Sequence, residues 1–179
     1  MIQPFPIILA SNSPRRKQLL EMIGINFDVQ PSSVYEDFNL DLSPEDFVQH
    51  YAREKSLDIA NKNHDHFVIG ADTVVVYNQK ILGKPKNIDD SFNMLKSLSG
   101  QTHSVYTGVS INKIDEGISE TFFEQTHVTF NKLTDEDISY YIETYKPLDK
   151  AGSYGIQDWF AVCVNRIEGC FYNVMGFPL

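Results

Sequence analysis

The sequence contains few cysteines and no long apolar run, and each shortage argues against a class of protein. Its two cysteines, Cys163 and Cys170, do not form a C-x-x-C motif. This usage argues against a disulfide scaffold and favours a reducing cytoplasm. No run of about 18 apolar residues is present, so we expect neither a membrane-spanning helix nor a membrane partner. The opening segment MIQPFP has no basic stretch and therefore does not resemble a secretory signal.

Basic residues are also scarce. Lys and Arg total 15 against 24 Asp and Glu, which gives a formal net charge of −9 at pH 7. Because nucleic-acid binders usually present a basic face, we expect no nucleic-acid partner. A small polyanionic ligand stays open, since local charge can oppose the net charge. Two common catalytic motifs are missing as well, the P-loop G-x-x-x-x-G-K-[ST] and the nucleophile elbow G-x-S-x-G.

What the chain does have is the composition of a globular protein. It contains 179 residues, of which 42% are apolar and 22% are charged. A chain of this length buries about 70% of its unfolded surface, which is enough for one core. No linker-like segment divides it, so the sequence predicts a single domain over residues 1–179, in which two lobes are allowed.

Helix and strand patterns alternate along the first part of the chain, and strand patterns cluster later. Ser13-Pro14 and Ser43-Pro44 are typical helix starts, because Ser caps the first turn and Pro needs no hydrogen bond there. The predicted strands cover residues 7–10, 27–29, 67–77, 80–82, 103–112, 119–130, 160–164 and 171–174, and the predicted helices cover residues 14–23, 44–60, 88–98 and 135–145. This order predicts an α/β fold with a mixed sheet.

The segment 11–16, SNSPRR, places two arginines in the first turn of a predicted helix. Cations there oppose the helix dipole, and a bound anion would remove the conflict. The hydroxyls of Ser11 and Ser13 suit phosphate oxygens, as do the backbone N–H groups of a helix start. The guanidiniums of Arg15 and Arg16 suit them equally well. The segment predicts a phosphate site, and its alternative is a pair of surface arginines that nearby acids neutralise.

An acidic residue, Asp72, interrupts the apolar run 68–76. A carboxylate in such a run must be hydrogen-bonded, paired with a cation or bound to a metal. Its partners are either Thr73 and backbone N–H groups, or a hard cation such as Mg²⁺, which takes one or two carboxylates together with phosphates and water. Glu36 is the candidate second carboxylate. Nothing local distinguishes it from Asp37, and a solvated loop acid is the alternative interpretation.

Two lysines and a glutamine complete the candidate residues. Lys84 lies in the tripeptide GKP, where the following proline favours an extended backbone that lets the ammonium meet a phosphate. Lys55 lies in a predicted helix, where exposed lysines are the norm. Gln157 lies in the glycine-bearing loop 149–158, and its amide suits the edge of a base. The alternatives are surface lysines and an ordinary connecting loop.

Taken together, these segments resemble the Maf family of nucleoside-triphosphate pyrophosphatases. The matching motifs are SNSPRR at 11–16, GADTV at 70–74, GKP at 83–85, LSGQTH at 98–103 and DKAGSYGIQ at 149–157. Their order and spacing cover nearly the whole chain, and the ordered set is far more specific than any one motif. The last motif resembles the branch of the family that prefers dTTP and UTP.

The resemblance implies a fold, a reaction and a cofactor. The implied fold is ITPase-like, with two lobes, a long mixed β-sheet flanked by helices and a central active-site cleft. The implied reaction is hydrolysis of dTTP, UTP and their modified forms between the α and β phosphates, which yields a nucleoside monophosphate and pyrophosphate. A divalent metal, Mg²⁺ or Mn²⁺, would assist the attack of water on the α-phosphorus.

The resemblance also implies roles for single residues. The positions that match phosphate-contacting residues of the family are Ser11, Arg15, Arg16, Lys55 and Lys84. Glu36 and Asp72 match acidic positions that are associated with the metal and the attacking water. Gln157 matches a position that shapes the base pocket. We therefore expect Asp72, Glu36 and Lys84 to act in catalysis, with Asp72 and Glu36 as the metal ligands.

Two features depart from the family pattern. Trp159 follows the Gln157 loop where many relatives have small residues, so it either alters access to the base or only packs. The chain ends at Leu179, where relatives usually continue into a C-terminal helix, so either the helix is lost or the sequence is truncated. We expect its absence to expose apolar surface, which either weakens stability or favours a homodimer. The alternative to an enzyme is a nucleotide-sensing module linked to cell division, because the family is associated with septum formation.

Overall fold

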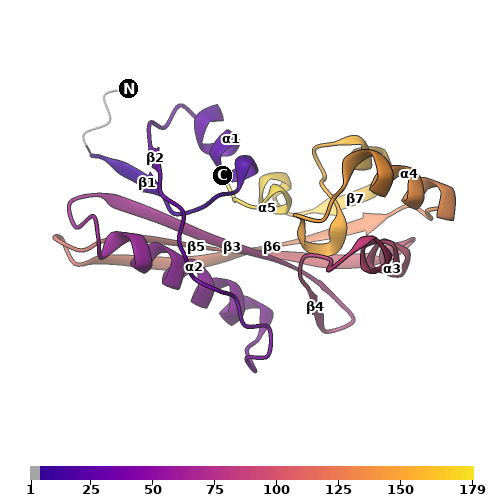
Figure 1. Ribbon diagram of the computed structural model, residues 1–179, viewed down its shortest axis with the longest axis horizontal. Helices are drawn as coiled ribbons and strands as arrows, with labels where there is room; N and C mark the ends of the chain where they lie inside the picture. The colour runs from indigo at the N-terminus through magenta and orange to yellow at the C-terminus, as the bar shows by residue number, and fades with distance from the viewer. Residues whose placement is uncertain (1–4) are drawn as a thin grey trace. The chain divides into compact units, whose positions relative to one another are not determined.

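The computed structural model describes residues 5–179, and its elements follow nearly the order expected from the sequence (Figure 1). Residues 1–4 of the opening segment lie outside the described residues. The strands are β1 (Ile7–Leu9), β2 (Asp28–Val29), β3 (Phe67–Tyr77), β4 (Lys80–Leu82), β5 (Thr102–Lys113), β6 (Ile118–Phe130) and β7 (Val164–Glu168). The α-helices are α1 (Pro14–Met22), α2 (Pro44–Ala60), α3 (Ile88–Leu98), α4 (Asp135–Tyr145) and α5 (Phe171–Met175), and two short 3₁₀ helices are η1 (Ala151–Ser153) and η2 (Trp159–Cys163).

The strands form one mixed sheet. Their order is β2-β1-β3-β5-β6-β7, and β4 pairs with β3. β1 runs parallel to both β2 and β3, whereas β4 is antiparallel to β3 and β7 is antiparallel to β6. Helices flank this sheet (Figure 1). The α/β fold with a mixed sheet that the sequence predicts is therefore confirmed.

The chain divides into two compact units. The first contains Met1–Asp72, Thr107–Glu124 and Gly176–Leu179, and the second contains Thr73–Tyr106 and Gln125–Met175. The long strands β3, β5 and β6 each contribute residues to both units. Of the predicted site residues, Lys84 and Gln157 belong to the second unit and all the others belong to the first.

In the first unit, α2 packs directly against the sheet (Figure 1). A Cβ atom added at Gly70 of β3 would collide with the backbone of Ala52, and one added at Gly108 of β5 would collide with the backbone of Val48. Glycine at both positions therefore lets the helix approach the strands more closely than any other residue allows. This close approach places the middle of α2 next to the residues of β3 just before Asp72, where the first unit's share of that strand ends.

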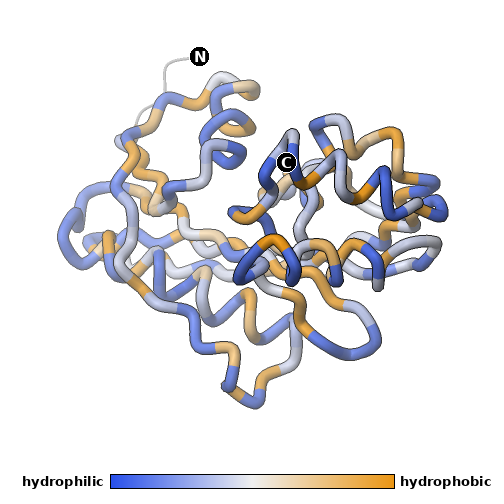
Figure 2. The backbone as a smooth tube through the Cα atoms, turned by 45° about the vertical axis from the view of Figure 1, so that its right-hand side comes forward, coloured by the Kyte–Doolittle hydropathy of each residue, from blue (hydrophilic) through white to orange (hydrophobic). Residues whose placement is uncertain are grey.

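The local sequence explains why α2 forms there. Ser43 caps the helix by accepting the N–H of Asp46 on its Oγ at 3.2 Å, and Pro44 follows it in the first turn. One face of the helix is buried, including Phe47 and Val48, which expose 0% of their surface. In Figure 2 the tube of α2 carries hydrophobic and hydrophilic stretches in alternation, as an amphipathic helix should.

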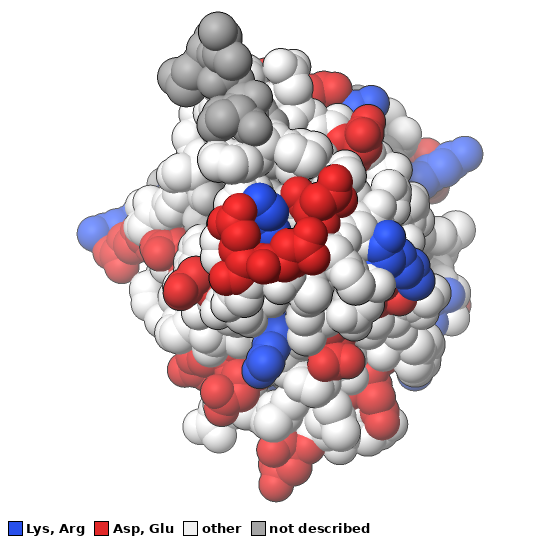
Figure 3. All heavy atoms as spheres, turned by 90° about the vertical axis from the view of Figure 1, so that its left-hand side faces the viewer, with Lys and Arg blue, Asp and Glu red and all other residues white. Residues whose placement is uncertain are grey.

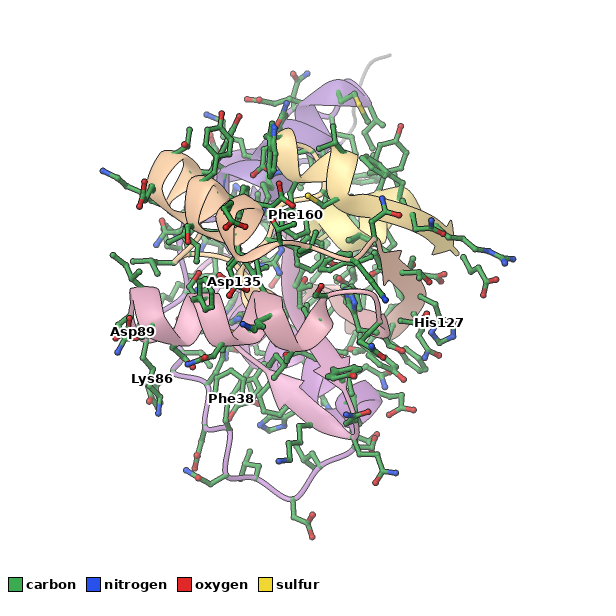
Figure 4. The ribbon with its side chains drawn as sticks, turned by 90° about the vertical axis from the view of Figure 1, so that its right-hand side faces the viewer. Phe38, Lys86, Asp89, His127, Asp135 and Phe160 are labelled. Carbon is green, nitrogen blue, oxygen red and sulfur yellow. The ribbon has the colours of Figure 1, made fainter. Side chains whose placement is uncertain are left out.

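In the second unit, α3 and α4 lie next to each other. Lys96 of α3 pairs with Asp135 at the start of α4, with Nζ 3.0 Å from Oδ1. Beneath these helices the rings of Phe130, Phe160 and other aromatic side chains meet, with 4.9 Å between these two centroids. In Figure 4 the labelled Phe160 lies inside, whereas His127 lies at the outer edge. Phe130 and Phe160 are buried and thus belong to the core of this unit.

Two predicted strands are helical in the structure, and β7 covers residues 165–168, where the sequence predicts no strand. The apolar run 160–164 predicts a strand, but η2 occupies most of it, because Asp158 accepts the N–H of Phe160 at 3.0 Å and starts a 3₁₀ turn. The run 171–174 also predicts a strand, but it forms α5. In this helix the buried side-chain amide of Asn173 donates hydrogen bonds to Val105 of β5 and Thr126 of β6. Short apolar runs do not distinguish a strand from a buried helical turn.

The surface and the cysteines agree with the composition. The face drawn in Figure 3 carries more acidic than basic side chains, in keeping with the net charge of −9. Cys163 and Cys170 are both free thiols, and Cys163 is buried. Within residues 5–179, none of the helices has the length and apolar character needed to cross a membrane.

Candidate active site

The predicted phosphate segment lies between β1 and α1, in the first unit. Ser13 is the N-cap of α1, and its Oγ accepts the N–H of Arg16 at 3.5 Å. Ser11 is buried, and its Oγ accepts the N–H of Ser13 and the Nη1–H of Arg16, each at 3.2 Å. The strand, turn and helix start therefore occur where the sequence places them. Two serines and one arginine form a single hydrogen-bonded group at this helix N-terminus.

The guanidinium of Arg16 is held from two directions. Its Nη1 donates to Ser11, and its Nε donates to the backbone oxygen of Gly176 at 2.8 Å. Burial lowers the pKa of Arg16, while the nearby carboxylate of Asp72 acts in the opposite direction. The charge of Arg15, on the same turn, lowers this pKa as well. A second anion near these guanidiniums would relieve both the desolvation and the repulsion.

Lys55 of α2 joins the two predicted carboxylates. Its Nζ lies 2.5 Å from Oε1 of Glu36 and 2.7 Å from Oδ1 of Asp72. The interpretation of Lys55 as an ordinary exposed lysine is wrong, because only 13% of its side chain is exposed. Asp72 is buried at 4% exposure, as its apolar sequence neighbours suggest. One ammonium therefore bridges a loop acid and a strand acid.

The structure gives Glu36 and its neighbour Asp37 different roles, which the sequence alone does not distinguish. Glu36 reaches Lys55. The Asp37 carboxylate instead accepts the backbone N–H and the side-chain Nδ2–H of Asn39, at 2.9 and 2.7 Å, and so closes a local turn. Asp37 therefore serves loop structure, whereas Glu36 belongs to the charged cluster. Neither role can be read from the adjacent letters E and D.

Asp72 has the most unusual environment in this cluster. Burial raises the pKa of its carboxyl group, the ammonium of Lys55 lowers it, and the carboxylate of Glu36 raises it again. Its Oδ1 accepts from Lys55, but its Oδ2 has no hydrogen-bond partner among residues 5–179. A buried carboxylate oxygen without a partner is costly, so this oxygen is a candidate for contact with a ligand, an ion or water.

These carboxylates fit a hard divalent cation. Mg²⁺ takes oxygen ligands and commonly uses one or two carboxylates together with substrate phosphates and water. Asp72 and Glu36 supply two carboxylates that meet at one ammonium, and Oδ2 of Asp72 is open to a further ligand. In the part of the chain that the structure describes, no three His, Cys, Asp or Glu residues gather into a metal site. A cation held here would thus need non-protein ligands such as phosphate oxygens.

In the second unit, the GKP tripeptide lies beside the glycine-bearing loop. The backbone N–H of Gly152 donates to the oxygen of Gly83 at 3.1 Å. Gly152 has φ +65°, and a Cβ atom there would collide with Val75 of β3. Lys84, which follows Gly83, is exposed. Two motifs that lie far apart in the sequence are therefore hydrogen-bonded neighbours.

The loop that carries Gln157 is held by a tyrosine that the sequence did not single out. The hydroxyl of Tyr141 in α4 accepts the N–H of Gly155 at 2.9 Å and donates to Oδ2 of Asp158 at 3.0 Å. These two residues bracket Gln157, which is itself exposed. The ring of Trp159 lies against Tyr141 at 6.1 Å between centroids, so Trp159 packs on this helix. No sequence pattern marks Tyr141, because helix periodicity only predicts that it is buried.

His103 is the second residue that anchors this loop. It exposes 2% of its surface, and its Nε2 lies 2.8 Å from the hydroxyl of Tyr154. Its Nδ1 has no hydrogen-bond partner among the described residues. Burial lowers the pKa of His103 to about 4, so the imidazole is neutral at physiological pH. The pair connects β5 to the segment just before Gln157.

The low pKa predicts a stability loss in acid. Because the unfolded imidazole titrates near 6.5 and the folded one near 4, the unfolded chain binds more protons between these values. Stability should therefore fall as pH decreases from about 6.5 to about 4, by about 3 kcal/mol in total. Denaturant unfolding across this range measures it, and His103→Gln should flatten that part of the profile. An imidazole of His103 that titrates near 6.5 by NMR would contradict the account.

Comparison with known proteins gives matches over nearly the whole chain. The family model of Maf-like proteins matches residues 6–179. A dTTP/UTP pyrophosphatase of Bacillus cereus strain G9842 is 50% identical over 173 residues, which are 97% of this chain and 90% of that protein. A dTTP/UTP pyrophosphatase of Bacillus anthracis is 49% identical over the same shares of both chains.

Among solved structures, the Staphylococcus aureus Ham1 protein matches with a TM-score of 0.49 and 14% identity, over 70% of this chain and 71% of that one. The family assignment does not depend on that distant likeness. It follows from the match of the family model over nearly the whole chain and from relatives at half identity. The chain belongs to the Maf-like protein family.

Proposed function

We propose that this protein hydrolyses dTTP and UTP to the corresponding nucleoside monophosphates and pyrophosphate. Support comes from membership of the Maf-like family and from relatives named dTTP/UTP pyrophosphatase at 50% identity. One observation on this chain carries the chemistry. The buried carboxylate of Asp72 has one oxygen held by Lys55 and a second oxygen without a hydrogen-bond partner among residues 5–179. An oxygen in that state can accept a proton from water.

Phosphate binding in this proposal uses the N-terminus of α1. The hydroxyls of Ser11 and Ser13 and the backbone N–H groups of the first turn donate to phosphate oxygens. Arg15 and Arg16 add two guanidiniums, and Arg16 is already oriented by Ser11 and by a backbone oxygen. Positive charge at a helix start, which is unfavourable in the free protein, then becomes favourable in the complex.

The residues of the second unit keep the roles that the family resemblance gives them. Lys84 contacts a phosphate, which its exposure on the GKP tripeptide allows. Gln157 contacts the base, because its exposed amide offers both donor and acceptor groups. Tyr141 and His103 support the loop on which Gln157 lies.

In the hydrolysis step, a water oxygen attacks the α-phosphorus in line with the bridging oxygen. A new bond forms between phosphorus and the water oxygen, and the bond to the α–β bridging oxygen breaks. Pyrophosphate leaves with the bonding electrons, and Asp72 accepts the proton of the water. Burial raises the pKa of Asp72, which makes it a stronger base than a solvated aspartate. The guanidiniums of Arg15 and Arg16 stabilise the charge that develops on the phosphates.

A divalent cation, Mg²⁺ or Mn²⁺, is part of the proposal. It would neutralise part of the triphosphate charge. Asp72 and Glu36 would hold it, and each carboxylate has enough lone pairs to keep its bond to Lys55 as well.

A nucleotide panel tests the function and its base preference. The purified protein is incubated with each common NTP and dNTP in Mg²⁺, Mn²⁺ or EDTA, and the products are separated by ion-exchange chromatography. We expect metal-dependent monophosphate and pyrophosphate from dTTP and UTP. The same products from a purine nucleotide only would contradict the role of Gln157. Tight binding without turnover would contradict the enzymatic proposal itself.

A further inference from the structure

The segment that carries Glu36 has no regular structure of its own. In the described structure, residues 30–43 form neither a helix nor a strand. Glu36 is nevertheless placed with its Oε1 2.5 Å from Lys55. A single ion pair on a long side chain does not fix a loop of this length, since the chain entropy that must be lost is large. Other contacts must therefore hold the segment.

The first contact precedes Glu36 in the chain. Oδ2 of Asp58 accepts three hydrogen bonds from two consecutive serines of the segment. The hydroxyl of Ser32 donates at 3.0 Å, and the N–H and hydroxyl of Ser33 donate at 2.9 and 3.3 Å. The other oxygen, Oδ1, accepts from Lys62 at 2.7 Å. Bonds from Lys62 and Ser33 lower the pKa of Asp58 to about 2, so the acceptor stays ionised.

The second contact directly follows Glu36. The hydroxyl of Tyr51 accepts the backbone N–H of Asp37 at 2.6 Å and donates to the backbone oxygen of the same residue at 3.3 Å. Tyr51 exposes 4% of its surface, so this pair of hydrogen bonds is largely shielded from water. Both backbone groups of the residue next to Glu36 are thereby fixed to α2.

The three contacts form one row on α2. Tyr51, Lys55 and Asp58 are four and three residues apart, and this spacing places them on the same face of a helix. They contact the segment in reverse order, so the chain around Glu36 runs antiparallel to the helix. The middle member of the row is the lysine that joins Glu36 to Asp72.

We propose that Tyr51 and Asp58 are positioning residues, which hold the backbone on both sides of Glu36 so that its carboxylate stays in the cluster with Lys55 and Asp72. The inference rests on the proposed function, because Glu36 matters for turnover only if the cluster is catalytic. Tyr51 and Asp58 themselves touch neither reacting atoms nor phosphates in this account. Their effect on the reaction passes through Glu36.

Hydrogen exchange tests the placement without reference to activity. The N–H groups of Ser33 and Asp37 are both donors in the row, so their exchange should accelerate in Asp58→Ala and Tyr51→Phe respectively. Exchange in the middle of α2 should stay unchanged in both variants. Unchanged exchange at Ser33 and Asp37 would overturn the proposal.

Kinetics test the link to Glu36. We expect Asp58→Ala and Tyr51→Phe each to lower kcat for dTTP by about 10-fold, as loss of supporting partners commonly does. KM should change less than kcat. Asp58→Asn keeps an acceptor oxygen and should recover part of the loss. Lys62→Gln is the matched control, because it removes only the ammonium that pairs with the other oxygen of Asp58. The side chain of Lys62 is 62% exposed, and this variant should leave kcat unchanged.

A double-mutant cycle separates positioning from a general loss of structure. If Asp58 acts through Glu36, Asp58→Ala should lower kcat no further in a Glu36→Gln background. Independent, multiplying losses would overturn the proposal, as would an equal loss in Lys62→Gln. A wild-type protein that releases no pyrophosphate would instead overturn the proposed function, and the exchange experiment would still decide the placement.

Discussion

Replacement of Asp72 by asparagine is expected to preserve nucleotide binding and to lower kcat by about 10²–10⁴-fold, the range typical for loss of a proton acceptor. Asparagine has nearly the same shape, and its oxygen can still accept from Lys55 at the position of Oδ1. The amide cannot take up a proton from water, because it is a far weaker base than a buried carboxylate. Hydrolysis should therefore be lost while the phosphate site on α1 stays intact.

Two measurements check this expectation. Titration calorimetry with a non-hydrolysable dTTP analogue should give an affinity within a few fold of the wild type, and pyrophosphate release should fall steeply. Asp37→Asn is the matched control, since that acid closes a turn with Asn39 and keeps an acceptor oxygen after the change. Full activity of Asp72→Asn would remove Asp72 from the mechanism. Loss of binding together with activity would indicate a role in the affinity instead.

Replacement of Lys55 by methionine is expected to cost about 3 kcal/mol of stability at neutral pH and to abolish turnover. Breaking a buried ion pair by removing one partner costs about 3–5 kcal/mol, because the opposite charge stays buried without a partner. Here two acids, Asp72 and Glu36, lose the ammonium that they share. Their mutual repulsion then adds to the desolvation of Asp72.

The pH dependence of this variant tests the electrostatic origin. Lys55 lowers the pKa of Asp72, so its removal raises that pKa further. Asp72 then protonates in the folded protein at a higher pH, and the deficit against wild type should shrink as pH falls from 8 towards 5. Urea unfolding at both pH values measures it. An equal deficit at both would show lost packing rather than lost charge pairing.

A control in the turn just after α2 makes the comparison quantitative. Lys62 also pairs with an acid, at 2.7 Å from Oδ1 of Asp58, but its side chain is 62% exposed. Exposed pairs contribute about 0–1 kcal/mol, so Lys62→Met should change stability by less than about 1 kcal/mol. A large loss in this control would mean that the Lys55 result does not depend on the burial of the ion pair.

Regular elements with strong local signals could be predicted from the sequence. Ser13-Pro14 and Ser43-Pro44 begin α1 and α2 because capping and proline chemistry act within one turn. The run that predicts β6 ends in residues that alternate between buried and more exposed positions, whereas β5 is buried along most of its length. The runs at 160–164 and 171–174 predict strands but form helical segments, because a few apolar residues fit a buried turn equally well.

The candidate site was predictable in part. Asp72 stands out because a charge inside an apolar run must have a partner, but the identity of that partner depends on how closely α2 approaches β3. That approach depends on glycines in two strands, and it turns Lys55 from an expected surface residue into a buried one. Long-range contacts of this kind leave no periodic trace in a single sequence.

The supporting residues differ in how far a signal was available. Tyr51, Lys55 and Asp58 have a spacing that puts them on one helix face, so a search for polar residues at that spacing could have found them. Tyr141 has no such mark, because its hydroxyl acts on a loop more than ten residues later in the chain. Its role depends on hydrogen bonds between distant parts of the chain that only the folded structure creates.

The position at which water attacks tests the central claim most directly. Wild-type protein is given dTTP in water labelled with heavy oxygen under single-turnover conditions, and both products are analysed by mass spectrometry. Attack on the α-phosphorus predicts that the label enters the nucleoside monophosphate and that the released pyrophosphate carries none. Label in the pyrophosphate, or release of single phosphates, would contradict the account.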